Sequence, residues 1–421
     1  MARLRIREPG PRSVLEPDLG QAYRDYLEVR IQFLLERYRT HPDFPGVHTG
    51  YNALTGVDFA TCDLVSYSWI NGRGACVFAL FADAFPAYRE ELLRFARKAI
   101  ETMEQHMDCH QGCLPFMVNL DGSERVIQQP VRAGRRSDSD LHGCQGFLEY
   151  GARAKDARRV ATARQMYVDI VRAIRNNDFV TQPTPTPATQ RPHCFFTINV
   201  ANVFVKLLGE TSFLEDARTM VENSIDSFYI PEWGAVVERI NTTGGPFVDD
   251  KGHSVVDPGH TIEFLAFALE FARLADAHGM KSAIQDRLDQ LAPQLLRWNL
   301  EHGWNARREG IYKNIDARSH APLNSDMPWW SLPEALVALL LAYERTGADE
   351  FLERYRQVNN AYFTHFLNPQ THYGPFQTRS GTTGEPIDVV PACKFQDPEF
   401  HAGRNLLACV HILNRLRGEV E

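Results

Sequence analysis

The feature of this sequence that most limits its fold is the regular alternation of two kinds of helical segment. Six segments are apolar on nearly all sides, and six segments between them carry one polar face. Matching positions in the apolar segments are separated by 71, 55, 61, 70 and 71 residues, at Arg73, Cys144, Asn199, His260, Trp330 and His401. Recurrence of this kind indicates a repeated supersecondary unit.

The two kinds of helix predict two layers. A helix that is apolar all round must be buried, whereas a helix with one polar face belongs outside. Six such pairs without an atypical capping repeat favour a closed ring over an open array. We therefore predict an all-α fold, an (α/α)6 barrel. Its inner helices begin near residues 63, 138, 194, 258, 328 and 398, and its outer helices span about 19–39, 86–106, 157–174, 213–228, 281–302 and 349–366.

Domain organisation follows from the same pattern. Residues 1–17 are rich in Arg, Pro and Gly, which predicts a flexible lead-in. Residues 18–421 then form a single barrel domain. Long segments with turn signals such as Asp121-Gly122 and Gly244-Gly245 follow the outer helices. We expect them to form loops and short hairpins over the face where the inner helices begin, and loops on a rigid scaffold often carry function.

Composition narrows the class of protein. The net charge of −8 and the short basic runs give no support to nucleic-acid binding or to binding an anionic membrane. The first residues lack the apolar run of a signal peptide, and the longest apolar run is too short to span a bilayer. Eight cysteines without a framework pattern indicate reduced thiols. We therefore expect a cytoplasmic protein.

Two inner helices begin with related sequences. Asp257-Pro258-Gly259-His260 is echoed by Asp397-Pro398-Glu399-Phe400-His401. Aspartate before a helix can accept hydrogen bonds from its first N–H groups, and proline suits the first helical position. Both histidines should therefore lie at one mouth of the barrel. Around them we predict a cleft of polar and aromatic side chains, which comprise Trp69, Asn71, Arg73, Asn199, Glu263, Trp330, Glu334, Lys394 and Arg404.

This set of side chains suggests proton transfer at a carbon atom. Neutral histidine is a suitable general base near neutral pH. Two imidazoles on opposite sides of one carbon could remove a proton from one face and return it to the other. A nearby arginine could stabilise the oxyanion of an enediolate. We predict His260, His401, Glu263 and Arg73 as catalytic residues and the remaining residues of the cleft as substrate ligands.

Four short motifs occur in order along the chain: Trp69-Ile70-Asn71-Gly72-Arg73, Asp257 to Glu263, Trp329 to Leu336 and Phe400 to Leu406. With them, the sequence from about Tyr51 to Leu416 resembles the N-acylglucosamine 2-epimerase family, which includes cellobiose 2-epimerases and mannose isomerases. The resemblance implies an (α/α)6 barrel without a cofactor and His260 and His401 as the acid/base pair. It also implies that Arg73 binds a substrate oxygen and that Glu263 supports His260.

The third inner helix departs from part of that family. Isomerases and cellobiose epimerases of the family usually carry a further histidine there, but in residues 193–200 the only one is His193, at the mouth. This favours 2-epimerisation of an N-acylglucosamine/N-acylmannosamine-type or related free sugar. An aldose–ketose isomerase of the mannose/fructose type is the alternative. Further alternatives are an (α/α)6 glycosidase or lyase that uses Glu263, Glu334 or Asp140, and a sugar-binding protein without turnover.

One cluster of histidine and cysteine residues resembles a set of metal ligands. His106, Cys109, His110 and Cys113 offer zinc-type ligands within eight residues. Ligands spread across a helix–loop junction rarely reach tetrahedral geometry, so we interpret the cluster as an ordinary helix end and predict no metal. The expected partner is a small-molecule sugar, without nucleic acid or membrane, and a homodimer is left open.

Overall fold

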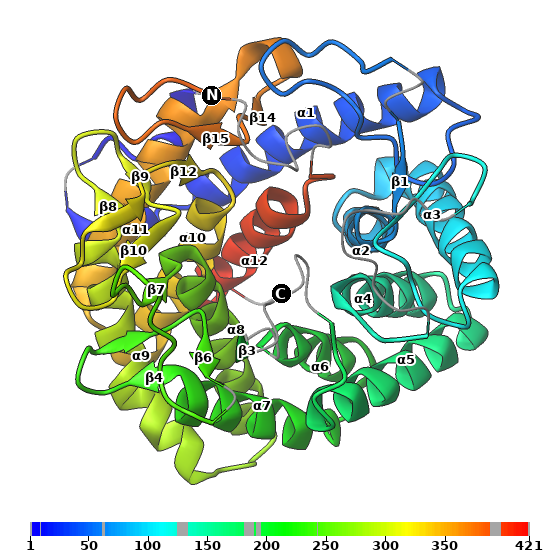
Figure 1. Ribbon diagram of the computed structural model, residues 1–421. Coiled ribbons are helices and arrows are strands. Elements are labelled where there is room, and N and C mark those ends of the chain that lie inside the picture. Colours follow the sequence, from blue (N-terminus) through cyan, green and yellow to red (C-terminus); the bar gives the residue numbers. More distant parts are fainter. Residues whose placement is uncertain are drawn as a thin grey trace.

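The computed structural model describes residues 2–8, 10–60, 64–123, 134–180, 189–190, 195–241, 243–387 and 397–419. Twelve α-helices in this described part form two concentric rings (Figure 1). The outer ring contains α1 (Asp18–Thr40), α3 (Arg89–Cys109), α5 (Ala157–Arg175), α7 (Phe213–Phe228), α9 (Ala283–His302) and α11 (Asp349–Ala361). The inner ring contains α2 (Ser68–Ala84), α4 (Asp138–Arg153), α6 (Phe195–Leu208), α8 (Pro258–Ala277), α10 (Ser331–Thr346) and α12 (Phe400–Leu416).

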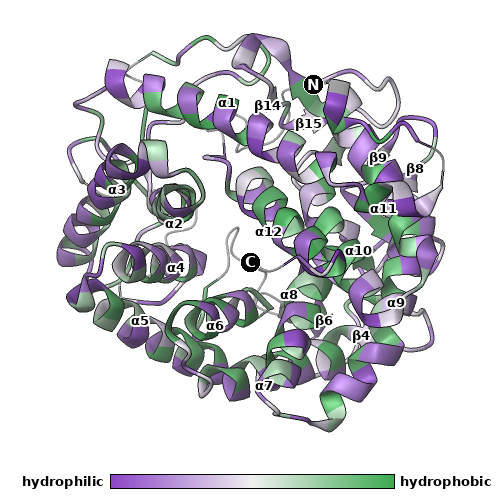
Figure 2. Ribbon diagram, turned by 180° about the vertical axis from the view of Figure 1, so that it is seen from behind, coloured by the Kyte–Doolittle hydropathy of each residue, from purple (hydrophilic) through white to green (hydrophobic). Residues whose placement is uncertain are grey.

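The ring is closed. The last inner helix, α12, contacts the first inner helix, α2, as well as α10 and α1. Outer helices show alternating hydrophilic and hydrophobic bands when coloured by hydropathy (Figure 2), as amphipathic helices do. Inner helices such as α8 are buried along nearly their whole length. The predicted (α/α)6 barrel is therefore confirmed.

Short strands occupy the connections from outer to inner helices. All pair antiparallel, mostly as two-stranded ladders, and one three-stranded sheet has the order β11-β10-β7. The strands are β1 (Ser66–Tyr67), β2 (Met117–Val118), β3 (Thr189–Gln190), β4 (Tyr229–Ile230), β5 (Ala235–Val236), β6 (Ile240–Asn241), β7 (Val255–Val256), β8 (Trp304–Asn305), β9 (Gly310–Ile311), β10 (Asn314–Asp316), β11 (Pro322–Asn324), β12 (Met327–Pro328), β13 (Leu367–Asn368), β14 (Gly374–Pro375) and β15 (Thr378–Arg379). This confirms the predicted loops and hairpins over one face.

Three inner helices begin later than predicted. The helices expected from residues 63, 328 and 398 begin at Ser68, Ser331 and Phe400. Strand pairing explains two of these shifts, because β1 pairs with β2 and β12 pairs with β15 directly before α2 and before the turn into α10. Backbone groups that are engaged in a ladder are not available to a helix. Among the described residues, no helix combines the length and apolarity needed to cross a membrane.

The N-terminal segment packs against the outer ring. Its described residues include two short 3₁₀ helices, Ala2–Leu4 and Pro11–Leu15. The N–H of Ile6 donates to Asn360 Oδ1 at 2.8 Å, and Asn359 Nδ2 donates to the Leu4 carbonyl at 2.7 Å. These bonds dock the segment on α11. The flexibility that we expect for residues 1–17 stays a prediction.

A buried ion pair fixes the start of α12. Glu399 lies directly before the helix with φ +65°, a left-handed conformation that is costly for a side chain other than glycine. Its carboxylate accepts from Arg30 Nε of α1 at 2.7 Å, and each side chain is only 1% exposed. Arg30 also donates to the carbonyls of Thr371 and His372, at 2.5 and 3.0 Å. The outer helix therefore sets the position of His401, two residues further on.

We expect Arg30→Met to lower the free energy of unfolding by about 3–5 kcal/mol, because it leaves the Glu399 carboxylate buried without its cation. Urea denaturation followed by circular dichroism measures this. The matched control is Arg12→Met, since Arg12 pairs with Asp349 at 3.7 Å on the surface with 76% of its side chain exposed. That change should cost less than about 1 kcal/mol. Equal losses in the two variants would contradict a structural role for the buried pair.

Candidate active site

His260 is held at the start of α8 by acidic side chains. Asp257 caps the helix, and its Oδ1 accepts from the His260 backbone N–H at 3.2 Å. The His260 ring atom Nδ1 lies 3.1 Å from Glu238 Oε1 and 3.4 Å from Asp257 Oδ2. Asp257 Oδ2 also accepts from Lys313 Nζ at 2.5 Å. The imidazole is therefore fixed on its Nδ1 side and remains 26% exposed.

These contacts shift the pKa values of His260 and Asp257. Burial alone lowers the pKa of His260, but the negative charges of Asp257 and Glu238 outweigh burial and raise that pKa above its usual value. Burial raises the pKa of Asp257, but His260 and Lys313 outweigh it and hold that pKa below its usual value. His260 therefore binds a proton more readily than an ordinary histidine.

His401 has a similar arrangement at the start of α12. Asp397 Oδ1 accepts from the backbone N–H groups of Phe400 and, at 3.3 Å, His401. His401 Nδ1 lies 2.7 Å from Glu334 Oε1, which also accepts from Arg404 Nη2 at 2.7 Å. Burial raises the pKa of Glu334, but Arg404 and His401 outweigh it, so the pKa is lowered. The ionised carboxylate of Glu334 therefore contacts the His401 imidazole, as acidic side chains contact the His260 imidazole.

Trp330 brings the two imidazoles together. The centroid of its indole ring lies 5.3 Å from the centroid of the His260 ring and 5.5 Å from that of the His401 ring. Lys313 Nζ lies 5.5 Å from the same indole centroid. Both predicted acid/base residues thus border one aromatic side chain.

The space in front of these rings, here called the front cavity, has a volume of about 280 Å³. Arg73 projects from α2 into it, with Nη1 3.1 Å from Asp397 Oδ2. Its guanidinium lies 4.8 Å from the Trp69 ring and 4.9 Å from the Phe400 ring. Burial lowers the pKa of Arg73 despite Asp397. The lining residues are Trp69, Arg73, His260, Glu263, Lys313, Pro328, Trp329, Trp330, Gln377, Asp397 and His401.

Glu263 lines the front cavity, and both imidazoles act electrostatically on its carboxyl group. Our prediction that it supports His260 stays a prediction, and the Nδ1 atom of His260 faces Glu238 and Asp257. Oxygen and nitrogen atoms of Glu263, Glu334 and His401 lie within 4.8 Å of one another. Burial and the Glu334 charge raise the pKa of Glu263. A metal ion could fit such a trio, but Glu334 is already bonded to His401 and Arg404, so we interpret it as a proton-sharing network.

Four predicted ligands are not brought to the front cavity. Asn71 donates to Ser66 Oγ at 3.0 Å and accepts from the N–H of Val47 at 2.8 Å, and it thereby holds the start of α2. Glu334 and Arg404 lie behind His401, and Asn199 lies deeper in the barrel. A fifth, Lys394, falls outside the described residues. Among the residues described, His106, Cys109, His110 and Cys113 form no metal-type cluster.

Several residues of the site were not predicted from the sequence, among them Pro328, Trp329, Gln377 and Asp397 of the cavity lining. Two further ones hold the His260 group. Glu238 and Lys313 come from the loops that precede α8 and α10. Their backbones are fixed because the Glu238 N–H donates to the Val255 carbonyl at 2.8 Å and the Lys313 N–H donates to the Asp326 carbonyl at 2.7 Å. The only available signal was a lone acid after the apolar run Ala235-Val236-Val237.

We expect Glu238→Gln to shift the acidic limb of the pH–rate profile to lower pH. The Glu238 charge raises the pKa of His260, so its removal lowers that pKa and leaves the neutral base available in more acidic solution. Initial rates of proton exchange between substrate and deuterated water, taken between pH 5 and 9, measure the limb. Asp249→Asn is the control, because Asp249 faces the partly exposed His253, outside the front cavity. An unmoved limb in Glu238→Gln would show that His260 does not control it.

A closed barrel of helix pairs, with two carboxylate-backed imidazoles beside one tryptophan, has the groups needed for proton transfer on a small molecule. The family model described as N-acylglucosamine 2-epimerase matches residues 67–397, and the chain belongs to this family.

Individual relatives agree with this assignment. The N-acylglucosamine 2-epimerase of Bos taurus is 23% identical over 381 residues, which cover 87% of this chain and 86% of the relative. Among solved structures, cellobiose 2-epimerase from Bacillus thermoamylovorans superposes with a TM-score of 0.72 at 14% identity, over 94% of this chain and 100% of the other. A D-mannose isomerase superposes with a TM-score of 0.73 at 11% identity, over 93% and 97%. At these identities the superpositions support the fold.

Proposed function

We propose that the protein is a sugar 2-epimerase that acts on an N-acylglucosamine/N-acylmannosamine-type or related free sugar. The observation that carries this proposal is the placement of His260 and His401 on one cavity, each with a carboxylate at Nδ1 and both beside Trp330. The bovine relative's name supports the N-acylated class of sugar.

The proposed reaction is inversion at C2. Carboxylates at Nδ1 fix the tautomer and assign proton transfer to Nε2 of each ring. In the ring-opened sugar, one neutral imidazole takes the C2 proton, and the electron pair moves to the carbonyl oxygen to give an enolate, which is an enediolate where C2 carries a hydroxyl group. Arg73 stabilises that oxyanion. The second histidine, protonated, gives its proton to the opposite face of C2, and the carbonyl reforms.

An aldose–ketose isomerase of the mannose/fructose type is the second candidate. The same cavity would serve it with a single imidazole that moves a proton from C2 to C1. The likeness to the mannose isomerase fold is compatible with this chemistry. The distinction rests on whether both imidazoles exchange protons with the substrate.

Hydrolysis or elimination at a glycosidic bond is less well supported. Inverting and retaining hydrolysis both need a carboxyl pair across the sugar. Asp140 is committed to Arg136, at 2.8 Å, and to the Ser137 N–H, at 2.9 Å. Glu334 lies behind His401, and Asp397 is paired with Arg73. Among the described residues that line the front cavity, Glu263 is left as the one carboxyl group without such a commitment.

The test is incubation of the protein in deuterated water with N-acetylglucosamine, N-acetylmannosamine, mannose, glucose and cellobiose, followed by proton NMR. We expect deuterium at C2 and formation of the C2 epimer from the N-acylated pair. Mannose that gives fructose would identify the isomerase. No deuterium at C2 in any sugar, together with release of reducing ends from oligosaccharides, would overturn the proposal.

Location and assembly remain part of the proposal. Five described cysteines, Cys76, Cys109, Cys113, Cys144 and Cys409, are free thiols, which suits the reducing cytoplasm. The homodimer stays a prediction, and light scattering with size-exclusion chromatography would decide it.

A further inference from the structure

The two aspartates that cap α8 and α12 are bonded in the same way. Asp257 Oδ1 accepts from the His260 backbone N–H at 3.2 Å, and Asp257 Oδ2 accepts from Lys313 Nζ at 2.5 Å. Asp397 likewise uses Oδ1 for its helix and Oδ2 for Arg73, at 3.1 Å. Both cations line the front cavity. Lys313 is therefore the counterpart of Arg73 on the His260 side of that cavity.

Lys313 combines a fixed backbone with a side chain at the edge of the front cavity. Its backbone N–H donates to the Asp326 carbonyl at 2.7 Å. Its side chain is 35% exposed, whereas the Asp257 side chain that it contacts is only 2% exposed. Its Nζ lies 5.5 Å from the centroid of the Trp330 indole, which borders the His260 ring at 5.3 Å. The ammonium group thus joins the buried helix cap to the open cavity.

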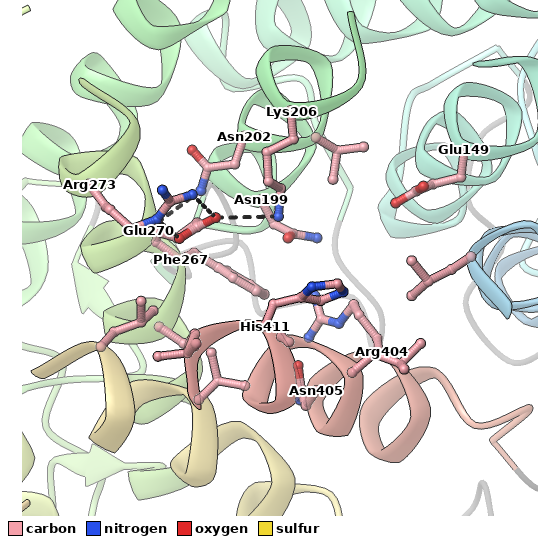
Figure 3. Close-up of a pocket in the computed structure, with 18 of the residues that line it drawn as sticks. Glu149, Asn199, Asn202, Lys206, Phe267, Glu270, Arg273, Arg404, Asn405 and His411 are labelled. Carbon is pink, nitrogen blue, oxygen red and sulfur yellow. Dashed lines mark hydrogen bonds and ion pairs between the residues drawn. The ribbon is translucent and has the colours of Figure 1, made fainter. Parts of the chain in front are cut away.

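The imidazole of His401 has its cation in a different place. Its partner Glu334 accepts from Arg404 Nη2 at 2.7 Å. Arg404 lines a second cavity, of about 480 Å³, together with other side chains of α12 such as His411 (Figure 3). Arg404 is not among the described residues that line the front cavity. A cation therefore holds an acidic partner of each imidazole, and of these two cations Lys313 is the one in the cavity where we place the sugar.

Titratable groups lie around the His260 ring on the cap of α8, on α8 itself, on the loops before β7 and β10, and on α12, which borders the same indole. They are Asp257, Glu263, Glu238, Lys313 and His401. Phe195 of α6 and Trp330 add uncharged rings, with centroids 6.2 and 5.3 Å from that of His260. Burial lowers the pKa of His260, and the acids Asp257 and Glu238 raise it by more. Lys313 acts against these acids and lowers that pKa.

We propose that Lys313 is a positioning residue for proton transfer by His260: its bond to Asp257 holds the imidazole in place, and its positive charge offsets the acids beside Nδ1. A base must be neutral to accept the C2 proton. Carboxylates without an opposing cation would keep the imidazole protonated in more alkaline solution, so the ammonium keeps the base available near neutral pH. The proposal rests on the proposed function, since it requires that His260 exchanges a proton with the sugar.

The experiment compares three substitutions at one position. Lys313→Met removes both the bond and the charge, Lys313→Gln keeps an N–H donor for Asp257 without the charge, and Lys313→Arg keeps both. Lys251→Met is the matched control, because Lys251 is exposed on the loop before β7 and does not line the front cavity. NMR titration of the full chain with isotope-labelled histidine, assigned by means of His260→Asn, gives the pKa of His260 without any sugar. Initial rates of proton exchange between substrate and deuterated water give the acidic limb.

We expect the pKa of His260 to rise in Lys313→Met and Lys313→Gln and to stay unchanged in Lys313→Arg and Lys251→Met. The acidic limb should move to higher pH in the first two variants, which is the direction opposite to that of Glu238→Gln. Above the limb, kcat should fall by about 10–100-fold in Lys313→Met and by less in Lys313→Gln, because a small misplacement of a reacting group is costly. KM should change little.

An unmoved His260 pKa in both Lys313→Met and Lys313→Gln would overturn the proposal, as would an equal rise in Lys251→Met. A large rise in KM in place of the pKa change would also overturn it and would make Lys313 a direct ligand of the sugar. The titration is done without sugar. Absence of deuterium exchange with every sugar tested would therefore refute the proposed function and leave the titration result for Lys313 standing.

Discussion

Replacing His401 with Asn is expected to slow C2 epimerisation by about 10²–10⁴-fold, the range that a positioned acid or base contributes. Asparagine keeps an N–H donor for Glu334 Oε1, which accepts from His401 at 2.7 Å, so the fold should survive. In this variant His260 still faces the cavity. It should therefore exchange the C2 proton of one epimer with deuterated water while the other epimer stays protonated. His260→Asn should reverse that preference.

The exchange pattern separates the two mechanisms. If both imidazoles take part, each single variant labels a different epimer, and NMR of N-acetylglucosamine and N-acetylmannosamine in deuterated water shows which one. If one imidazole alone moves the proton, one variant loses all exchange and the other keeps it. His253→Asn is the control, since His253 is 36% exposed and lies outside the front cavity. Full epimerisation by both site variants would contradict any acid/base role.

Arg73→Met is expected to lower kcat/KM by about 10²–10³-fold, the cost of removing one preorganised group from a developing oxyanion. The guanidinium is well placed for this role because the Trp69 and Phe400 rings, 4.8 and 4.9 Å away, hold it in the front cavity. Initial rates with the sugar identified by deuterium exchange provide the measurement. The loss should fall mainly on kcat, because the charge it stabilises forms only in the transition state.

A structural loss must be distinguished from a catalytic one. Arg73 pairs with Asp397, which also caps α12, so helix content and thermal unfolding of Arg73→Met should be compared with those of Arg73→Lys. Lysine keeps the positive charge but not the planar fork, so an intermediate rate is expected. Equal rates in Met and Lys variants with intact folds would exclude charge stabilisation by this residue.

The alternation of apolar and amphipathic helices was enough to predict the barrel, because a helix that is apolar on all sides must be buried and therefore belongs to the inner ring. The capping motifs were enough to place His260 and His401, since Asp257 and Asp397 accept from the helix N–H groups as their spacing suggested. The depth of other side chains was harder to predict. His401 is the second residue of α12, whereas Asn199 is the fifth of α6. At about 1.5 Å of rise per residue, it lies further along the barrel axis.

The hydrogen-bond partners of the two imidazoles could not be predicted from sequence patterns, for a different reason. Glu238 reaches His260 only because a backbone hydrogen bond to Val255 folds its loop against β7. Asn71 belongs to a recognisable motif, but the motif does not reveal that its amide is used by Val47 and Ser66. Loop geometry and hydrogen-bond competition depend on contacts between distant segments, and hydropathy does not record them.

The helices of the inner ring fall into two groups that carry different kinds of side chain. The groups that we propose to transfer or share protons come from three successive inner helices, α8, α10 and α12, through His260, Glu334 and His401. On the facing arc, His142 of α4 and Phe196 of α6 pack with ring centroids 4.6 Å apart, and His142 lies 6.4 Å from Trp69. The carboxylate contacts of His260 and His401 come from neither α4 nor α6, so a substitution of His142 or Phe196 would leave those contacts in place.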